Sequence, residues 1–165
     1  MMEDIIYQGK ILDLIKLDKR WEIVRHAPAV CILALQGDKV LGVRQYRPAI
    51  AQETWEVPAG LIDEGESPDE AALRELSEET QLGGKLKRIA EFYTSPGFCD
   101  EKIYLFEATE LYEHAARPDE GENLQAGWEK LADIWQALCS GRVASSAPTL
   151  LALSYALGLR ASQKL

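Results

Sequence analysis

Acidic side chains crowd one short segment of the chain. Eight of the 27 acidic residues stand against a single base, Arg74, in this segment, which alone carries a net charge of -7: Asp63, Glu64, Glu66, Asp69, Glu70, Glu75, Glu78 and Glu79. Like charges four residues apart destabilise a helix by about 0.2–0.5 kcal/mol per pair. Mg2+ takes oxygen ligands and keeps several waters, so carboxylates on one helical face suit it beside a phosphate. The cluster is consistent with a magnesium site or with a solvated acidic face.

A helix must position these carboxylates. Ser67 suits the N-cap, Pro68 the first helical position, and Glu70 completes a Ser-x-x-Glu capping box. We predict a helix from Ser67 to Thr80. The spacing gives it an inner stripe that packs on a sheet, made of Ala72, Leu73, Leu76 and Thr80.

A loop should precede this helix at Pro58-Ala59-Gly60. Gly60 and Gly65 permit backbone geometries that would bring the Ala59 carbonyl and Glu66 near the helix.

The other elements are strands and helices in irregular order. We predict two short strands between Asp4 and His26, a hairpin over Ala29–Arg47 with its turn at Gly37-Asp38, strands at Trp55–Val57, Leu86–Tyr93 and Lys102–Glu107, and helices at Glu129–Leu138 and Ala147–Leu157. The order lacks the strict alternation of a parallel sheet. It predicts an α+β fold with a mixed sheet in a sandwich.

Composition narrows the class of protein. The 165 residues suit one domain, and a net charge of -9 with a pI of about 4.8 disfavours nucleic-acid and anionic-membrane partners. The longest apolar run, Ala29–Leu35, is too short to span a bilayer, and the first residues lack the basic end of a signal peptide. The cysteines, Cys31, Cys99 and Cys139, suggest no disulfide framework. We expect a soluble cytoplasmic protein.

The stretch GLIDEGESPDEAALRELSEETQL, residues 60–82, resembles the Nudix box. That pattern is Gly, five residues, Glu, seven residues, Arg-Glu, an aliphatic, any residue, Glu-Glu, any residue, Gly, aliphatic. Only Gln81 departs, at the final glycine. A helix C-terminus often needs a left-handed residue there, so either Gln81 strains the turn or the helix ends at Gly83 or Gly84.

The resemblance implies a Nudix-like α/β/α sandwich with a Mg2+ site, Mn2+ being the alternative metal. Its ligands would be Glu75 and Glu79, assisted by Glu78 and the Ala59 carbonyl. Arg74 would orient the carboxylates, and Arg74 and Glu78 would take part in catalysis.

Motifs outside the box resemble the ADP-ribose pyrophosphatase subgroup. SPGFCDE, residues 95–101, implies Gly97 and Glu101 as substrate-binding residues. VRQYRP, residues 43–48, implies a diphosphate contact from Arg44 or Arg47, of which we favour Arg47. RPDEGEN, residues 117–123, resembles a loop that supplies a catalytic carboxylate, with Glu122 preferred and Glu120 as the alternative.

The N-terminal residues 1–28 resemble a strand pair that is exchanged in a homodimer. Trp21 would then help hold adenine by stacking, although a core tryptophan is an equal alternative. The resemblance implies hydrolysis of ADP-ribose to AMP and ribose 5-phosphate. The alternatives are another nucleoside diphosphate sugar or dinucleotide, a non-catalytic nucleotide-sensing module, or an isomerase using Cys99.

Overall fold

A seven-stranded mixed sheet organises the computed structural model, which describes residues 2–116 and 124–162. Five of its strands run in the order β10 (Gln125–Lys130), β5 (Lys39–Arg47), β4 (Ala29–Gln36), β9 (Lys102–Glu113), β8 (Leu82–Tyr93). The other two lie off this path: β6 (Gln52–Glu56) pairs with β5, and β7 (Ala59–Leu61) pairs with β4. Only the β4–β9 pairing is parallel among these contacts of the described residues.

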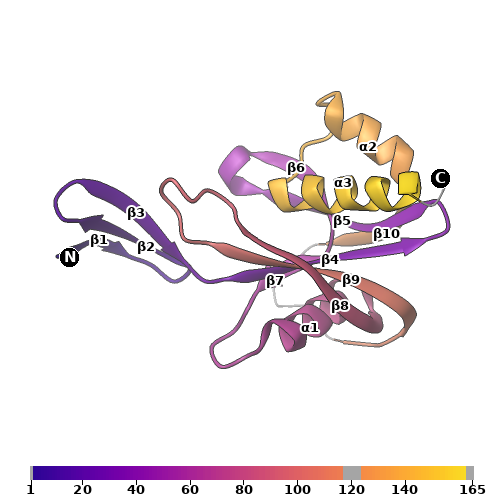
Figure 1. The fold of residues 1–165 in the computed structure, drawn as a ribbon, viewed down its shortest axis with the longest axis horizontal. Coiled ribbons are helices and arrows are strands. Elements are labelled where there is room, and N and C mark those ends of the chain that lie inside the picture. Colours follow the sequence, from indigo (N-terminus) through magenta and orange to yellow (C-terminus); the bar gives the residue numbers. More distant parts are fainter. Residues whose placement is uncertain (1, 117–123, 163–165) are drawn as a thin grey trace.

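Helices cover both faces of this sheet. Helix α1 (Pro68–Thr80) lies on one face, and α2 (Leu131–Cys139) and α3 (Ala147–Ser162) lie on the other (Figure 1). The first six residues of β4 are all buried, because alternate side chains enter two different cores. Cys31 and Leu33 pack in the core with α2 and α3, whereas Val30 and Ile32 pack in the core with α1. The predicted α/β/α sandwich of the α+β class is confirmed.

Helix α1 follows its predicted boundaries closely. The Ser67 side chain accepts a hydrogen bond from the Glu70 amide, and the Glu70 carboxylate accepts one from the Ser67 amide, so the capping box is formed. Ala71, Ala72 and Leu76 are buried, while Leu73 is only partly buried. Thr80 is partly buried as well, and the core between α1 and the sheet contains Ala71 in place of Leu73 and Thr80, so the predicted inner stripe is correct only for Ala72 and Leu76.

The N-terminal segment forms three strands rather than the expected two. They are β1 (Glu3–Gln8), β2 (Leu12–Leu17) and β3 (Trp21–His26), which form a separate antiparallel sheet. A turn separates β1 from β2, and in it the Gly9 amide donates to the Leu12 carbonyl at 3.0 Å. The prediction missed this turn because its last residue, Ile11, is apolar and continues the strand pattern.

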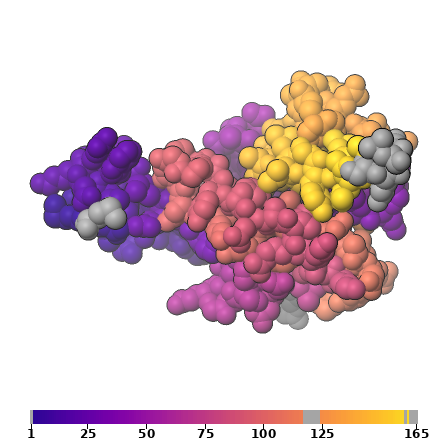
Figure 2. Space-filling model, viewed as in Figure 1, coloured from indigo at the N-terminus to yellow at the C-terminus, as the bar shows by residue number. Residues whose placement is uncertain are grey.

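This sheet projects from the rest of the molecule (Figure 1; indigo in Figure 2). Its root is held by the loop between β8 and β9, because the Val24 amide donates to the Phe98 carbonyl at 2.7 Å and the Asp100 amide to the Val24 carbonyl at 3.1 Å. Large apolar side chains on the sheet are each more than half exposed, namely Ile5, Ile6, Tyr7, Ile11 and Trp21. Trp21 is thus an exposed residue of this chain, not a core one.

Several other boundaries differ from the sequence predictions. Glu129 and Lys130 end strand β10, so the helix expected from Glu129 begins at Leu131. Strands β8 and β9 and helix α3 are longer than expected, and the predicted loop at residues 58–60 includes the start of β7. No helix in the described part of the chain is long and apolar enough to cross a membrane.

Candidate active site

Two carboxylates of helix α1, those of Glu75 and Glu79, lie against strand β7. The Glu79 carboxylate accepts a hydrogen bond from the Ala59 amide at 3.1 Å, and Glu79 is only 9% exposed. Glu75 lies against the next residue, Gly60. A methyl group on Gly60 would come within 2.0 Å of a Glu75 carboxylate oxygen. Two carboxylates one helical turn apart therefore lie beside the Ala59–Gly60 peptide.

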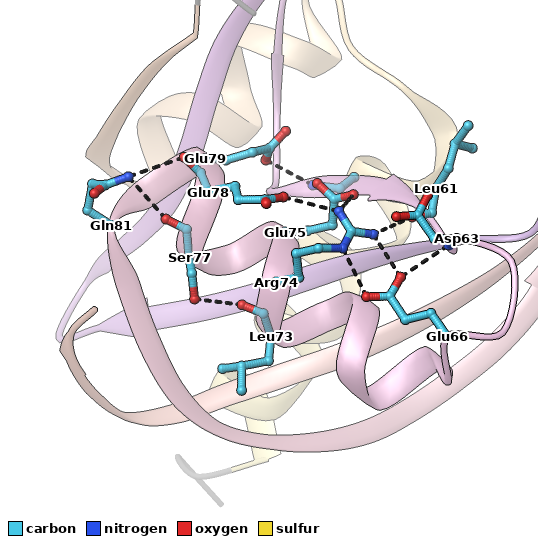
Figure 3. Close-up of polar contacts among 11 residues, drawn as sticks. Leu61, Asp63, Glu66, Leu73, Arg74, Glu75, Ser77, Glu78, Glu79 and Gln81 are labelled. Atoms are coloured by element: carbon cyan, nitrogen blue, oxygen red, sulfur yellow. Dashed lines mark hydrogen bonds and ion pairs between the residues drawn. The ribbon is translucent and has the colours of Figure 1, made fainter. Parts of the chain in front are cut away.

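Arg74 lies at the centre of the acidic residues (Figure 3). Its Nε and one Nη donate to the two carboxylate oxygens of Glu66, both at 2.9 Å. The other Nη donates to Glu75 at 2.7 Å and to Glu78 at 3.1 Å. The Leu61 carbonyl accepts a further bond from Arg74 at 2.8 Å. Arg74 thus joins the loop to the helix and compensates for much of the crowded negative charge.

These contacts shift the ionisation of the groups concerned. The hydrogen bond from Arg74 holds the pKa of Glu66 below its usual value. The same interaction, together with those to Glu75 and Glu78, raises the pKa of Arg74. Glu66 and Arg74 therefore remain a charged pair around neutral pH. The expectation that Gly60 and Gly65 bring Glu66 near the helix agrees with this geometry, and Gly65 has a positive φ of 83°.

Gln81 accommodates its departure from the box without moving the helix end. It adopts the left-handed conformation, with φ 59° and ψ 26°, and its amide donates to the Ser77 carbonyl at 2.8 Å. Helix α1 ends at Thr80, so the alternative endings at Gly83 and Gly84 are wrong. The Gln81 side chain also donates to the Ala116 carbonyl at 2.9 Å and accepts from the Ala116 amide at 3.2 Å.

The acidic residues line a cleft of about 920 Å³. Ala59, Arg74, Glu75, Glu78 and Glu79 form part of its wall, and the sequence-predicted Arg47 and Glu101 also line it. Sequence reasoning missed several other wall residues, which are Lys10, Ile11, His26, Glu56, Ser145, Ser146, Pro148 and Thr149. The cleft thus collects side chains from the N-terminal sheet, the central sheet, α1 and the start of α3.

His26 and Glu101 meet in this wall. The His26 Nδ1 lies 2.8 Å from the Ala27 carbonyl and 3.5 Å from a Glu101 carboxylate oxygen. The Thr94 hydroxyl donates to the other Glu101 oxygen at 2.8 Å. Neither spacing nor charge pattern marks His26 in the sequence, since its neighbourhood arises only when the N-terminal sheet docks on the loop.

Other predicted site residues lie elsewhere. Arg44 donates a hydrogen bond to Glu129 of β10 at 2.7 Å and is not among the described residues that line the cleft. Trp21 and Gly97 are likewise absent from its described lining, and the Arg20 guanidinium lies 4.6 Å from the ring centre of Trp21. The two candidate bases, Glu120 and Glu122, lie outside the described residues.

The donor set suits a hard cation that keeps several waters. Glu75 and Glu79 converge on one peptide of β7, and all the available donors are oxygens. No three acidic, histidine or cysteine side chains of the described residues converge as a complete ligand set. Arg74 provides a physical reason, because it binds Glu75 and Glu78. Glu75 and Glu79 therefore suit a divalent cation that takes oxygen ligands and keeps several waters.

Known proteins resemble this chain in sequence over most of its length. The NUDIX domain family model matches residues 25–150. The ADP-ribose pyrophosphatase of Bacillus subtilis (strain 168) is 39% identical over 163 residues, covering 91% of this chain and 87% of that protein. The methanol dehydrogenase activator of Bacillus methanolicus is 38% identical over 138 residues, covering 81% and 74%.

A solved structure shows the same fold. It is described as an ADP compounds hydrolase and superimposes with a TM-score of 0.79 at 24% identity, covering 99% of this chain and 94% of that one. The family resemblance seen in residues 60–82 is confirmed by the match to residues 25–150. The chain belongs to the NUDIX domain family.

Proposed function

We propose that this protein is a Mg2+-dependent hydrolase of ADP-ribose that releases AMP and ribose 5-phosphate. The observation that carries the proposal is the placement of Glu75 and Glu79 beside one peptide of β7, in a cleft that also contains Arg47. Relatives named ADP-ribose pyrophosphatase support the choice of substrate, including those of Bacillus subtilis and Mycobacterium tuberculosis. Free cysteines in the described chain fit the reducing cytoplasm, where we place the protein.

Glu75 and Glu79 would hold the cation, with Glu78 and the Ala59 carbonyl assisting. When bound, Mg2+ neutralises diphosphate charge and favours attack by water. Arg74 keeps Glu75 and Glu78 in place through its bonds to both carboxylates and to Glu66.

The remaining roles belong to the substrate and the attacking water. Arg47 would bind the diphosphate as a charge-assisted donor. Glu101 would contact the substrate from the loop between β8 and β9, which is hydrogen-bonded to the N-terminal sheet. Glu122, with Glu120 as the alternative, would orient the water and take its proton.

We also propose a homodimer formed through the N-terminal sheet. Its exposed apolar side chains make a patch of the kind that marks protein interfaces. Trp21 lies on this sheet and does not line the cleft of its own chain, so we propose that it stacks on adenine in the partner's cleft.

The deciding experiment is a panel of diphosphate compounds assayed for AMP release with Mg2+. ADP-ribose should be the best substrate, compared with ADP-glucose, flavin and nicotinamide dinucleotides. Faster turnover of another compound would reassign the substrate. Absence of turnover with every compound, despite nucleotide binding, would instead favour a nucleotide-sensing module.

A further inference from the structure

Glu56 is a nearly buried carboxylate in the wall of the cleft. Its side chain is only 5% exposed, whereas that of its partner Arg47 is 44% exposed. Arg47 grips it through two parallel hydrogen bonds, from Nε to Oε1 at 2.9 Å and from Nη2 to Oε2 at 2.8 Å. This bidentate geometry fixes the plane of the guanidinium as well as its position.

Further donors hold Glu56 itself in place. The Thr54 hydroxyl, on the same strand, donates to Oε1 at 2.7 Å. The interaction with Ser146, beside the start of α3, also lowers the pKa of Glu56. Burial alone raises the pKa of a carboxyl, but the bonds from Arg47 and Thr54 outweigh burial and leave the pKa of Glu56 below its ordinary value. Glu56 is therefore an anion with a fixed position.

The presence of a buried carboxylate in a cleft that we propose binds an anionic diphosphate requires a physical explanation. Direct contact between the two would be repulsive, so Glu56 is not suited to touch the substrate phosphates. Arg47 can separate the two anions. One edge of its guanidinium is held by Glu56, and the residue lines the same cleft as Glu75 and Glu79.

We propose that Glu56 is a positioning residue that aims Arg47 at the diphosphate. The inference rests on the proposed function, in which Arg47 binds that group. An arginine already held by Glu56 loses less side-chain freedom when the substrate arrives, so binding is stronger than with a mobile arginine. The effect of Glu56 should therefore pass entirely through Arg47.

The test is a double-mutant cycle with Glu56→Gln and Arg47→Ala. Glutamine keeps the shape of Glu56 but replaces one acceptor oxygen with an amide that repels the guanidinium. With Arg47 present, Glu56→Gln should lower kcat/KM for ADP-ribose about tenfold, mainly through KM, as expected for coupled neighbours. In the Arg47→Ala background the same substitution should change kcat/KM less than about twofold.

The cycle separates positioning from mere structural support. An equal loss in both backgrounds would show a general structural role and overturn the proposal, as would no loss with Arg47 present. Glu110→Gln is the matched control, because Glu110 is an exposed glutamate paired with Lys85 away from the cleft. That control should leave both kinetic constants unchanged.

A second variant keeps the test valid if Glu56→Gln fails to fold. Thr54→Val removes one donor to Glu56 but preserves both charges of the pair. It should raise KM about threefold with Arg47 present and should have no further effect in Arg47→Ala. An equal rise of KM in both backgrounds would contradict the proposal.

The same cycle can be measured without turnover. Inorganic pyrophosphate is titrated with Mg2+ into each variant by calorimetry, and Glu56→Gln should weaken binding only when Arg47 is present. If wild-type protein releases no AMP from ADP-ribose but the pyrophosphate cycle shows this coupling, the proposed function fails and the role of Glu56 stands. If AMP is released and the coupling is absent, the reverse holds.

Discussion

Glu79 combines burial with contact to the strand that faces it. Its carboxylate accepts the Ala59 amide at 3.1 Å, and glutamine can keep this bond through its remaining oxygen. Glu79→Gln should therefore fold normally while lowering turnover by about 10²-fold or more, because a catalytic cation stabilises transition-state charge by several kcal/mol. Steady-state AMP release and thermal melting check this. An unchanged rate would remove Glu79 from the metal site.

Gly60 is required at its position by the approach of Glu75. In Gly60→Ala the new methyl group would meet the Glu75 carboxylate, which lies at the end of a flexible side chain and can swing away. We expect a melting temperature close to that of the wild type but at least about tenfold lower kcat/KM, because the displaced group is a proposed metal ligand. A magnesium titration of activity should show a raised requirement for the ion.

Gly127→Ala is the control for that experiment. A methyl group on Gly127 would meet nothing within 4 Å, and Gly127 lies on β10 away from the described cleft lining. Equal losses in the two alanine variants would mean that the approach of Glu75 to Gly60 has no special role.

Glu122 is the preferred base, on the grounds of motif resemblance alone. Glu122→Gln should retain magnesium binding, measured by calorimetry, while lowering kcat by about 10²–10⁴-fold, the usual contribution of general acid–base catalysis. Full activity in Glu122→Gln combined with loss in Glu120→Gln would transfer the role to Glu120.

At the scale of elements, Gln81 links the end of helix α1 to the chain after β9. Gln81→Gly keeps the left-handed turn without its steric cost but removes the side-chain bonds to Ala116. These effects oppose each other, so the free energy of unfolding should change by no more than about 1 kcal/mol. Amide hydrogen exchange at Ala116 should become faster, because its described acceptor is the lost side-chain oxygen.

His114 provides an internal control in the same variant. Its amide donates to the backbone carbonyl of Gln81 at 2.9 Å, and this bond survives the substitution. His114 should stay protected in an exchange measurement by NMR. Unchanged exchange at Ala116, or equal acceleration at both amides, would argue against the side-chain link.

Local signals explain which elements could be predicted from the sequence. The capping box and Pro68 act within one turn, so the start of α1 follows directly from neighbouring residues. Strand β10 was missed because its six residues are exposed or only partly buried, which hides the apolar pattern of a strand. The turn between β1 and β2 was missed because Ile11 is apolar and so continues the strand pattern, although its side chain lies exposed at a bend.

The candidate site follows the same division. Glu75, Glu78 and Glu79 belong to one helix, and their spacing alone places them close together. The contact between Arg47 and Glu56 depends on the antiparallel pairing of β5 with β6. In this register Arg47 lies opposite Gln52, and Glu56 lies opposite Val43. Ser145 reaches the wall because its hydroxyl donates to the Trp55 carbonyl at 2.6 Å, ninety positions away in the chain. Spacing in the sequence does not predict a contact between residues so far apart in the chain.

At the scale of the whole molecule, the projecting N-terminal sheet predicts a dimer. Ile6 is 59% exposed on β1, so Ile6→Glu should convert a dimer into a monomer by placing a charge in an apolar interface. Light scattering after size-exclusion chromatography measures the mass. Leu151→Glu, at a 42% exposed leucine of α3, is the control and should remain dimeric. A wild-type monomer at micromolar concentration would contradict the proposed assembly.

Sharing of the site between subunits can be tested by mixing two defective variants. Trp21→Ala should raise KM, since stacking on a base contributes about 1–3 kcal/mol, whereas Glu79→Gln should lower turnover in its own cleft by about 10²-fold or more. If Trp21 serves the partner's cleft, a mixed dimer contains one intact site, with Trp21 from one subunit and Glu79 from the other. Random exchange of subunits should then restore about a quarter of the wild-type sites, seen as AMP release at low ADP-ribose concentration. If Trp21 served its own cleft instead, a mixed dimer would contain no intact site, and the mixture would show only the average of the two variants.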